Sequence, residues 1–329
     1  MSSLDRAIHA GVPREAVALY ARWWQFEGWL RHLAYFVLRS TWGIAWESEV
    51  NTRAFEYARR DNLVHLPSPD TGDLLAYLDF SLLLSLIDGQ WSQFEPFLLR
   101  RQIWLGRCEE LKIIRNRIAH LRRPGKRDLA RVETTLEDLE PGYREAVRAL
   151  GATDQLGERP DEQVMEAYRC GPLADLSSHA QRKYGVDISL SVSCMPWAEL
   201  PNPPASVTGT AGVLWQLSVG GPDIWVSPHI FQRHLPARVR EALVYAFMPV
   251  PFGATFAAAG VDDASTATLA LQGALETFLH SITNPSNFPQ EATREWPGDT
   301  AILDPRILVE HLFAVVDDPD APGSIFGVS

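Results

Sequence analysis

Residues 13–40 read PREAVALYARWWQFEGWLRHLAYFVLRS. Large apolar side chains recur in this stretch at alternating steps of four and three residues, at Leu19, Trp23, Phe26, Leu30, Leu33 and Val37. That spacing places them along one side of an α-helix. Pro13 suits the first turn of a helix, and Gly43 follows where such a helix should end. The stretch therefore predicts a long amphipathic helix against a hydrophobic core.

Four further helices are expected before residue 150, at about 47–60, 72–87, 91–122 and 127–150. Pro124-Gly125 stops the fourth, whereas Pro96 in its first turns is either tolerated or kinks it. Pro141-Gly142 leaves open an interruption of the fifth. Seven of the eleven tryptophans precede residue 105, which favours a dense aromatic core or an aromatic interface. Five helices with short connections predict a bundle.

The pattern changes after residues 151–160, GATDQLGERP, which are small, polar and acidic. We interpret them as a linker between one domain at residues 1–150 and a second at residues 161–329. Alternation with period two predicts strands at 186–192, within 212–219 and at 223–226, with Gly220-Gly221 as a hairpin turn. Helices are expected at 237–247, 264–282 and 305–315. The predicted fold class is therefore multidomain: an all-α bundle followed by an α+β or α/β domain.

The composition favours a cytoplasmic protein without a metal or other cofactor. The three cysteines are widely spaced and odd in number, so neither a disulfide framework nor a cysteine zinc site is indicated. His229 and His234 lack a zinc-ligand spacing that we recognise. The first residues show no secretion signal, and the longest apolar run, residues 74–87, is too short to span a bilayer. No membrane partner is expected.

Positive charge is concentrated in one segment of an acidic chain. The net charge of −11 argues against a general nucleic-acid binder. Residues 100–131, however, contain eleven Lys or Arg and three acidic residues, so this segment carries +8 and the remainder −19. Such a segment is a candidate phosphate-binding surface, and a solvated helix face is the alternative.

The basic segment contains the sequence RNRIAH at residues 115–120. The apolar residues around it recur at steps of three and four and should face the core, namely Leu111, Ile114, Ile118 and Leu121. On an ideal helix Asn116 and His120 lie about 40° apart and point away from that core. Arg115 lies about 140° from His120. Either its long side chain or a second copy of the domain would have to bring the two together.

This motif resembles the signature of the HEPN superfamily of ribonucleases, R-x(4–6)-H with a polar residue after the arginine. Arg115, Asn116 and His120 occupy its positions near the end of a long helix. Residues 26–33 and Trp42-Gly43-x-x-Trp46 resemble the opening of HEPN domains from prokaryotic defence and toxin systems. The resemblance covers residues 13–150 at most. One HEPN subclass has a regulatory tyrosine two residues after the histidine, and Arg122 stands there in this chain.

The resemblance implies a metal-independent endoribonuclease that acts as a homodimer. It assigns catalysis to Arg115, Asn116 and His120, whereas the cations expected to hold the RNA backbone are Arg117, Arg122, Arg123, Lys126 and Arg127. Histidine suits proton transfer at neutral pH, and arginine suits a phosphate that gains negative charge. Attack by the RNA 2′-hydroxyl would give 2′,3′-cyclic phosphate and 5′-hydroxyl ends.

The resemblance also suggests a toxin–antitoxin or antiviral defence effector, whose C-terminal domain would bind an antitoxin or another trigger. One alternative is a non-catalytic HEPN module for dimerisation or RNA binding that serves the C-terminal domain. A third interpretation makes the C-terminal domain an enzyme and the bundle an accessory. Spacing alone locates no clustered polar pocket for that enzyme.

Overall fold

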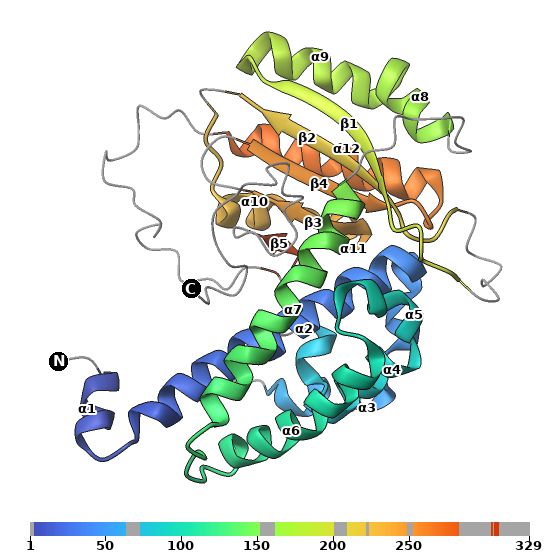
Figure 1. Cartoon of the computed structure of the whole chain (residues 1–329). Helices are drawn as coiled ribbons and strands as arrows, with labels where there is room; N and C mark the ends of the chain where they lie inside the picture. The colour runs from blue at the N-terminus through green and yellow to red at the C-terminus, as the bar shows by residue number, and fades with distance from the viewer. Residues whose placement is uncertain are drawn as a thin grey trace.

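A computed structural model describes residues 3–63, 73–151, 162–200, 209–221, 224–248, 253–282, 304 and 306–308. A helical bundle forms the lower part of the molecule in Figure 1, and a five-stranded sheet with its own helices forms the upper part. The bundle contains α2 (Arg14–Trp42), α3 (Thr52–Asp61), α4 (Phe80–Gly89), α5 (Trp91–Phe94), α6 (Arg101–Ala119) and α7 (Asp128–Gly151), and the short helix α1 (Ser3–His9) precedes it. The expected organisation, a helical part followed by a part that mixes helices and strands, is confirmed.

The first predicted helix is confirmed as α2, which starts directly after Pro13 and ends at Trp42, with Gly43 as its C-cap. Gly43 has a φ of +60°, a conformation that glycine adopts without steric cost. A Cβ at this position would also collide with the carboxylate of Asp262. The helix end therefore requires glycine for its backbone conformation and for close packing against the C-terminal half.

Two predicted helices begin later than expected because a side chain caps the backbone. The helix predicted at 47–60 starts at Thr52, after a 3₁₀ helix at Gly43–Glu49, and the side chain of Asn51 accepts a hydrogen bond from the N–H of Arg53. The helix predicted at 72–87 is a 3₁₀ helix, Leu74–Tyr77, followed by α4. Asp79 separates the two because its carboxylate caps the start of α4.

The helix predicted at 91–122 is wrong as a single element. It consists of α5, a 3₁₀ helix at Glu95–Phe97 that contains Pro96, and α6. Leu98 and Arg100 have extended backbone angles between them, so the axis changes direction there. By contrast, α7 runs through Pro141 without a break.

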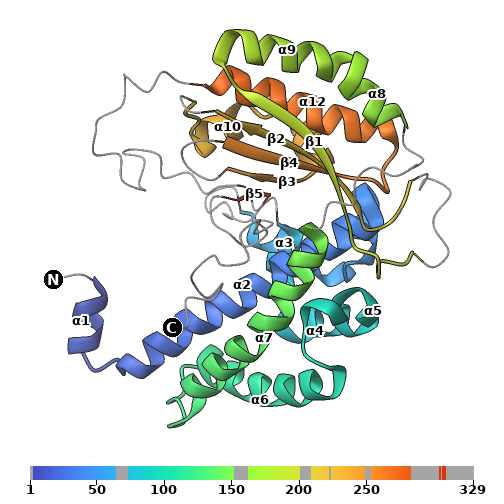
Figure 2. The same cartoon turned by 45° about the horizontal axis from the view of Figure 1, so that its top comes forward.

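The sheet has the order β1-β2-β4-β3-β5, in which only the β3–β5 pair is parallel. Its strands are β1 (Asp187–Cys194), β2 (Val213–Gly220), β3 (Leu243–Phe247), β4 (Gly253–Ala259) and β5 (Ile307–Leu308). The helices of this half are α8 (Glu162–Cys170), α9 (Pro172–Tyr184), α10 (Pro228–His234), α11 (Ala237–Ala242) and α12 (Ala264–Ser281). Figure 2 shows α12 behind the sheet and α2 below it.

Alternate residues of the strands enter two different cores. Trp215, Leu217 and Val219 of β2 pack into the cluster that contains α12, whereas Leu214 packs into the cluster that contains α2 and the rest of the bundle. Ala257 and Ala259 of β4 join the same bundle cluster. The core of the bundle therefore continues onto one face of the sheet, and α2 serves both parts of the molecule.

Several predictions for the second half are wrong. Gly220-Gly221 does not form the expected hairpin, because β2 pairs with β1 and β4 and residues 224–226 form no strand of the sheet. The helix predicted at 237–247 stops at Ala242, and the chain continues as β3. Within the helix predicted at 305–315, residues 307–308 form β5 and residues 309–315 lie outside the described residues.

Five elements have no counterpart among the predictions, namely α1, α8, α9, α10 and β4. The helix predicted at 264–282 is confirmed as α12. Residues 152–160 of the predicted linker lie outside the described residues. In the described part of the chain, no helix combines the length and the hydropathy needed to cross a membrane.

Candidate functional site

The RNRIAH motif occupies the C-terminal end of α6. Asn116 and His120 are exposed, as the helical spacing predicts, and His120 is the residue that directly follows the helix. Leu121, which was expected to face the core, is instead 95% exposed. It has left the helix with a φ of +51°, so the helical spacing no longer applies to it.

The chain leaves α6 through a hydrogen-bonded reversal. The N–H of Leu121 donates to the carbonyl of Ile118 at 3.1 Å, and the N–H of Arg122 donates to the carbonyl of Arg117 at 2.8 Å. These two bonds form a Schellman motif, in which glycine usually occupies the position that Leu121 has here. His120 therefore lies on a defined turn and not on a fraying helix end.

Arg117 stabilises this turn from within. Its guanidinium contacts the two carboxylate oxygens of Asp128 at 2.6 and 2.7 Å, and one of these oxygens also accepts the N–H of Gly125 at 2.8 Å. The side chain of Asp128 is only 6% exposed. Since its charge is balanced by Asp128, Arg117 is a weaker candidate for RNA contact than the neighbouring cations.

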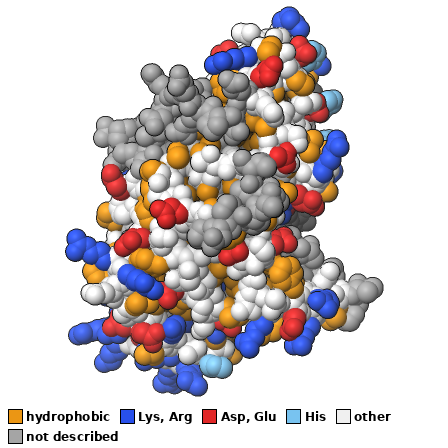
Figure 3. Space-filling model, turned by 90° about the vertical axis from the view of Figure 1, so that its right-hand side faces the viewer, with side chains coloured by type: hydrophobic (Ala, Val, Ile, Leu, Met, Phe, Trp, Pro, Cys, Tyr) orange, Lys and Arg blue, Asp and Glu red, His pale blue; other side chains and the backbone are white. Residues whose placement is uncertain are grey.

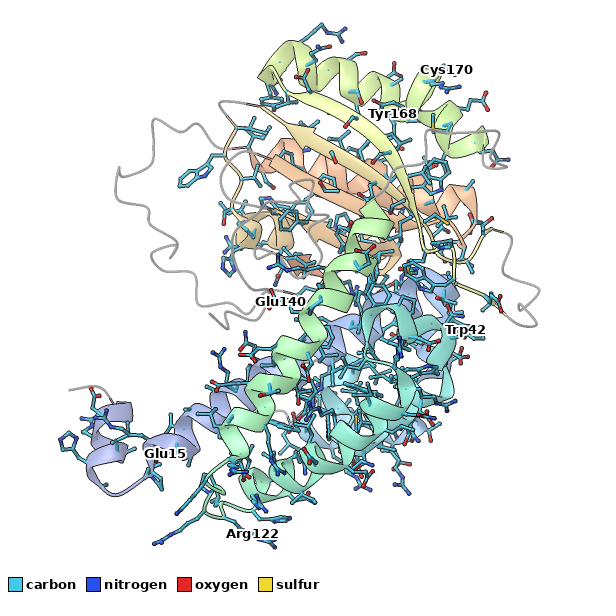
Figure 4. The ribbon with its side chains drawn as sticks, in the orientation of Figure 1. Glu15, Trp42, Arg122, Glu140, Tyr168 and Cys170 are labelled. Atoms are coloured by element: carbon cyan, nitrogen blue, oxygen red, sulfur yellow. The ribbon has the colours of Figure 1, made fainter. Side chains whose placement is uncertain are left out.

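Cations without a partner gather at the same end of the molecule. Five of the eleven basic residues in the 100–131 segment form ion pairs, namely Arg101, Arg107, Lys112, Arg117 and Arg131. Four others are exposed, have no partner among the described residues and belong to the turn between α6 and α7: Arg122, Arg123, Lys126 and Arg127. Figure 3 shows Lys and Arg side chains concentrated over this lower end of the bundle. In Figure 4 the side chain of Arg122 points away from the ribbon into solvent.

Arg115 lies between two hollows on the surface of the bundle. One, of about 200 Å³, lies between the start of α4 and α6 and is lined by Asp79, Phe80, Ser81, Lys112, Arg115 and Asn116. The other, of about 220 Å³, lies between α2 and α6 and is lined by Tyr20, Trp23, Trp24, Glu27, Arg31, Arg115, Ile118 and Ala119. Within the described residues, Arg115 forms no hydrogen bond or ion pair. Its guanidinium can therefore receive an anion at either hollow.

A buried carboxylate lines the hollow between α2 and α6 together with Arg115. The sequence leaves open whether Glu27 and Arg31 form a surface ion pair or belong to the site. Glu27 is 8% exposed and accepts hydrogen bonds from Arg31 and from the indole N–H of Trp23. Arg31 also donates to the carbonyls of Leu75 at 3.1 Å and Leu78 at 3.2 Å. The pair is thus largely buried, and it lines the same hollow as Arg115.

Sequence reasoning missed Tyr20 and Trp24, which also line this hollow. A signal was present, because both residues fall outside the apolar stripe that contains Leu19 and Trp23. An aromatic residue on the polar face of an amphipathic helix is expected to be more exposed to solvent than one in the apolar stripe. Tyr20 and Trp24 are 54% and 71% exposed.

Arg115 and His120 do not line a common hollow among those described above. Arg115 lines both hollows, whereas His120 lines neither of them. This separation agrees with the angle of about 140° expected on a helix.

No protein-family model matches this sequence, and no significant match exists among curated proteins or solved structures. Across the described ranges, no three His, Cys, Asp or Glu residues are arranged to hold a metal ion.

Proposed function

We propose that this protein is a metal-independent endoribonuclease of the HEPN type, in which Arg115, Asn116 and His120 carry out the reaction. The observation that carries the proposal is the placement of Arg115. It lies in a surface hollow without a partner among the described residues, one residue before exposed Asn116, and it precedes a turn with four exposed cations. Positive charge that no protein group balances is suited to the phosphates of RNA.

These side chains suit cleavage by the 2′-hydroxyl of the substrate. The imidazole of His120 accepts the proton of that hydroxyl while its oxygen bonds to the adjacent phosphorus. The bond from phosphorus to the 5′-oxygen then breaks, and this oxygen takes up the proton from the same imidazolium. Arg115 stabilises the charge that gathers on the phosphoryl oxygens. DNA lacks the nucleophile and should resist cleavage.

A homodimer is needed because Arg115 and His120 face different sides of α6. Ile113 lies seven residues before His120, which puts the two about 20° apart on the helix. It is 57% exposed, and Leu105 on the same helix is 45% exposed. Exposed apolar side chains on this helix favour contact between two copies of α6. We propose that such a contact places Arg115 of one chain near His120 of the other.

The proposed biological role follows from the family resemblance. A ribonuclease of this kind would act as a defence or toxin effector in the cytoplasm. Its sheet-containing half would bind an antitoxin or another trigger that restrains the nuclease.

A second candidate is a non-catalytic dimerisation or RNA-binding module. The separation of Arg115 from His120 in one chain favours it, because neither residue alone completes a catalytic site. Both candidates predict dimers and salt-sensitive RNA binding. Only the nuclease predicts strand cleavage.

The deciding experiment incubates purified protein with total RNA and tRNA in EDTA and analyses the fragment ends. The wild-type protein should produce 2′,3′-cyclic phosphate and 5′-hydroxyl ends. Loss of a proton-transfer group slows such reactions by about 10²–10⁴-fold, so His120→Ala should be nearly inactive, and Arg115→Ala should also be strongly impaired. Arg107→Ala is the matched control, because Arg107 lies on the same helix and pairs with Asp138. The nuclease proposal would be overturned if all four proteins cleaved RNA equally, or if none of them cleaved it.

A further inference from the structure

The hollow between α2 and α6 has an aromatic rim. The rings of Tyr20 and Trp24 lie 6.3 Å apart, with their planes tilted by 38°. Trp24 is 71% exposed, although a tryptophan normally buries most of its large surface. Nothing in the hydrophobic core requires a tryptophan at this position. An exposed indole at the edge of a hollow offers a flat face for a stacked ligand.

The charges of the hollow leave one cation unbalanced. Glu27 and Arg31 neutralise each other, and Arg31 also donates to two backbone carbonyls. Arg115, on the opposite wall, has no partner within the described residues. The site thus combines a flat apolar surface with a single positive group. A nucleotide has the same two parts, a planar base and a phosphate.

The volume of the hollow limits how much of a nucleic acid it can hold. Its volume of about 220 Å³ is below the roughly 300–1,000 Å³ of pockets that enclose drug-sized ligands. One base fits such a space. A base inside a duplex is stacked between its neighbours and cannot reach a side chain in this way.

We infer that this hollow is a subsite for one unpaired base of an RNA strand. The base stacks on the indole of Trp24, and the phosphate attached to its nucleoside contacts Arg115. The inference rests on the proposed function in taking RNA as the ligand. It adds that the substrate is single-stranded at this position, as in a loop or an unpaired tail.

A binding experiment with the full-length chain tests the subsite. His120→Ala serves as the background so that RNA stays intact, and fluorescence anisotropy measures affinity for a short single-stranded RNA. Trp24→Ala should weaken binding about tenfold, as expected when one stacked base is lost. Trp24→Phe should retain most of the affinity. Tyr57→Ala is the control and should have no effect, because Tyr57 is an exposed aromatic residue on α3 that lines neither hollow.

A second RNA of the same length, with abasic riboses throughout, separates stacking from phosphate binding. Trp24→Ala and its parent should bind this strand equally. The subsite is wrong if Trp24→Ala leaves binding of the normal RNA unchanged, or if it weakens binding of the abasic strand to the same extent. Absence of cleavage by the wild-type protein, together with base-dependent binding at Trp24, would reject the nuclease and retain the subsite. Cleavage by the wild-type protein, together with RNA binding that Trp24→Ala does not change, would retain the nuclease and reject the subsite.

Discussion

Arg39 and Asp262 form an ion pair of 2.7 Å in the interior of the protein, although 223 residues separate them in the sequence. Their side chains are 0% and 4% exposed. Arg39 also donates to the carbonyl of Ala242 at 2.7 Å, and the second carboxylate oxygen of Asp262 accepts the N–H of Ile44 at 2.8 Å. The pair therefore attaches the end of α2 to the sheet-containing half of the chain.

Removal of one member of this pair should strongly destabilise the fold. Arg39→Met leaves the charge of Asp262 buried and unpaired, and we expect the free energy of unfolding to fall by about 3–5 kcal/mol. Urea denaturation measures this loss. Arg101→Gln is the control, because its pair with Asp88 is about half exposed and should be worth at most about 1 kcal/mol. The double variant Arg39→Met with Asp262→Leu should recover part of the loss. Similar small effects for Arg39→Met and Arg101→Gln would contradict the prediction.

Mixed dimers should restore activity to two inactive variants. If Arg115 of one chain acts with His120 of the other, a dimer of Arg115→Ala and His120→Ala chains retains one complete site of two. An equimolar mixture after subunit exchange should reach about a quarter of wild-type cleavage, because half of its dimers are mixed. The assay measures cleavage of the same RNA before and after mixing. A mixture as inactive as its parts would show that the two groups act from one chain.

The exposed turn between α6 and α7 should determine the salt dependence of RNA binding. Each phosphate contact on a single strand contributes about 0.7 to the slope of log affinity against log salt, so four lost contacts should reduce the slope by about 3. The test variant replaces the four cations with glutamine, at Arg122, Arg123, Lys126 and Arg127. The control replaces four exposed arginines outside this turn, at Arg53, Arg59, Arg60 and Arg100. If the slope changed equally in both variants, RNA would not bind preferentially to this turn.

Leu121→Gly should stabilise the fold. Leu121 adopts a left-handed conformation at 95% exposure, so it carries backbone strain without gaining burial. Glycine removes this strain, which is about 1 kcal/mol for a residue with a Cβ. Thermal or urea unfolding should therefore show higher stability for Leu121→Gly than for Leu121→Ala. A loss of stability would indicate a contact of Leu121 beyond the single chain.

Asp263 should make the stability of the fold sensitive to acid. Hydrogen bonds from Ser265 and Thr266 lower the pKa of Asp263 to about 2 at the start of α12. Because the pKa is lowered in the folded state, the contribution is complete above the usual value of 3.8 and disappears as the pH falls towards 2. Asp263→Ala should cost about 1 kcal/mol at neutral pH, the ordinary value of a helix cap.

Urea unfolding at several pH values measures this dependence. The difference between wild-type protein and Asp263→Ala should shrink between pH 4 and pH 2. Asp263→Asn is the control, since it retains the cap without a titrating group. A difference that stays constant throughout this range would contradict the assignment.

The sequence was most informative where one helix face decides burial. The stripe from Leu19 to Val37 predicts α2 almost to the residue, and the run from 264 to 282 predicts α12. Prediction failed where a local cap or a tertiary contact overrides periodicity. The Asp79 carboxylate splits a largely apolar run, and small alanines in β4 form a central strand because both faces of the sheet are covered.

For the candidate site, helix geometry predicts the exposure of Asn116 and His120 and the divergence of Arg115 from His120. It could not predict that Arg117 pairs with Asp128, since that contact depends on how the chain reverses after the helix. Nor could it place Glu27 and Trp24 beside Arg115. Their meeting depends on the packing of two helices that are remote in sequence.

The 29 residues of α2 form one continuous rod. At 1.5 Å per residue, Trp24 lies about 22 Å along the helix axis from Arg39. Arg39 is the residue through which α2 pairs with Asp262 of the sheet-containing half. If α2 tilted by about 5° around this ion pair, the indole of Trp24 would move by about 2 Å. Shifts of this size accompany the switching of subunit interfaces. A small change of angle at the Arg39–Asp262 pair is thus enlarged at the distant aromatic hollow.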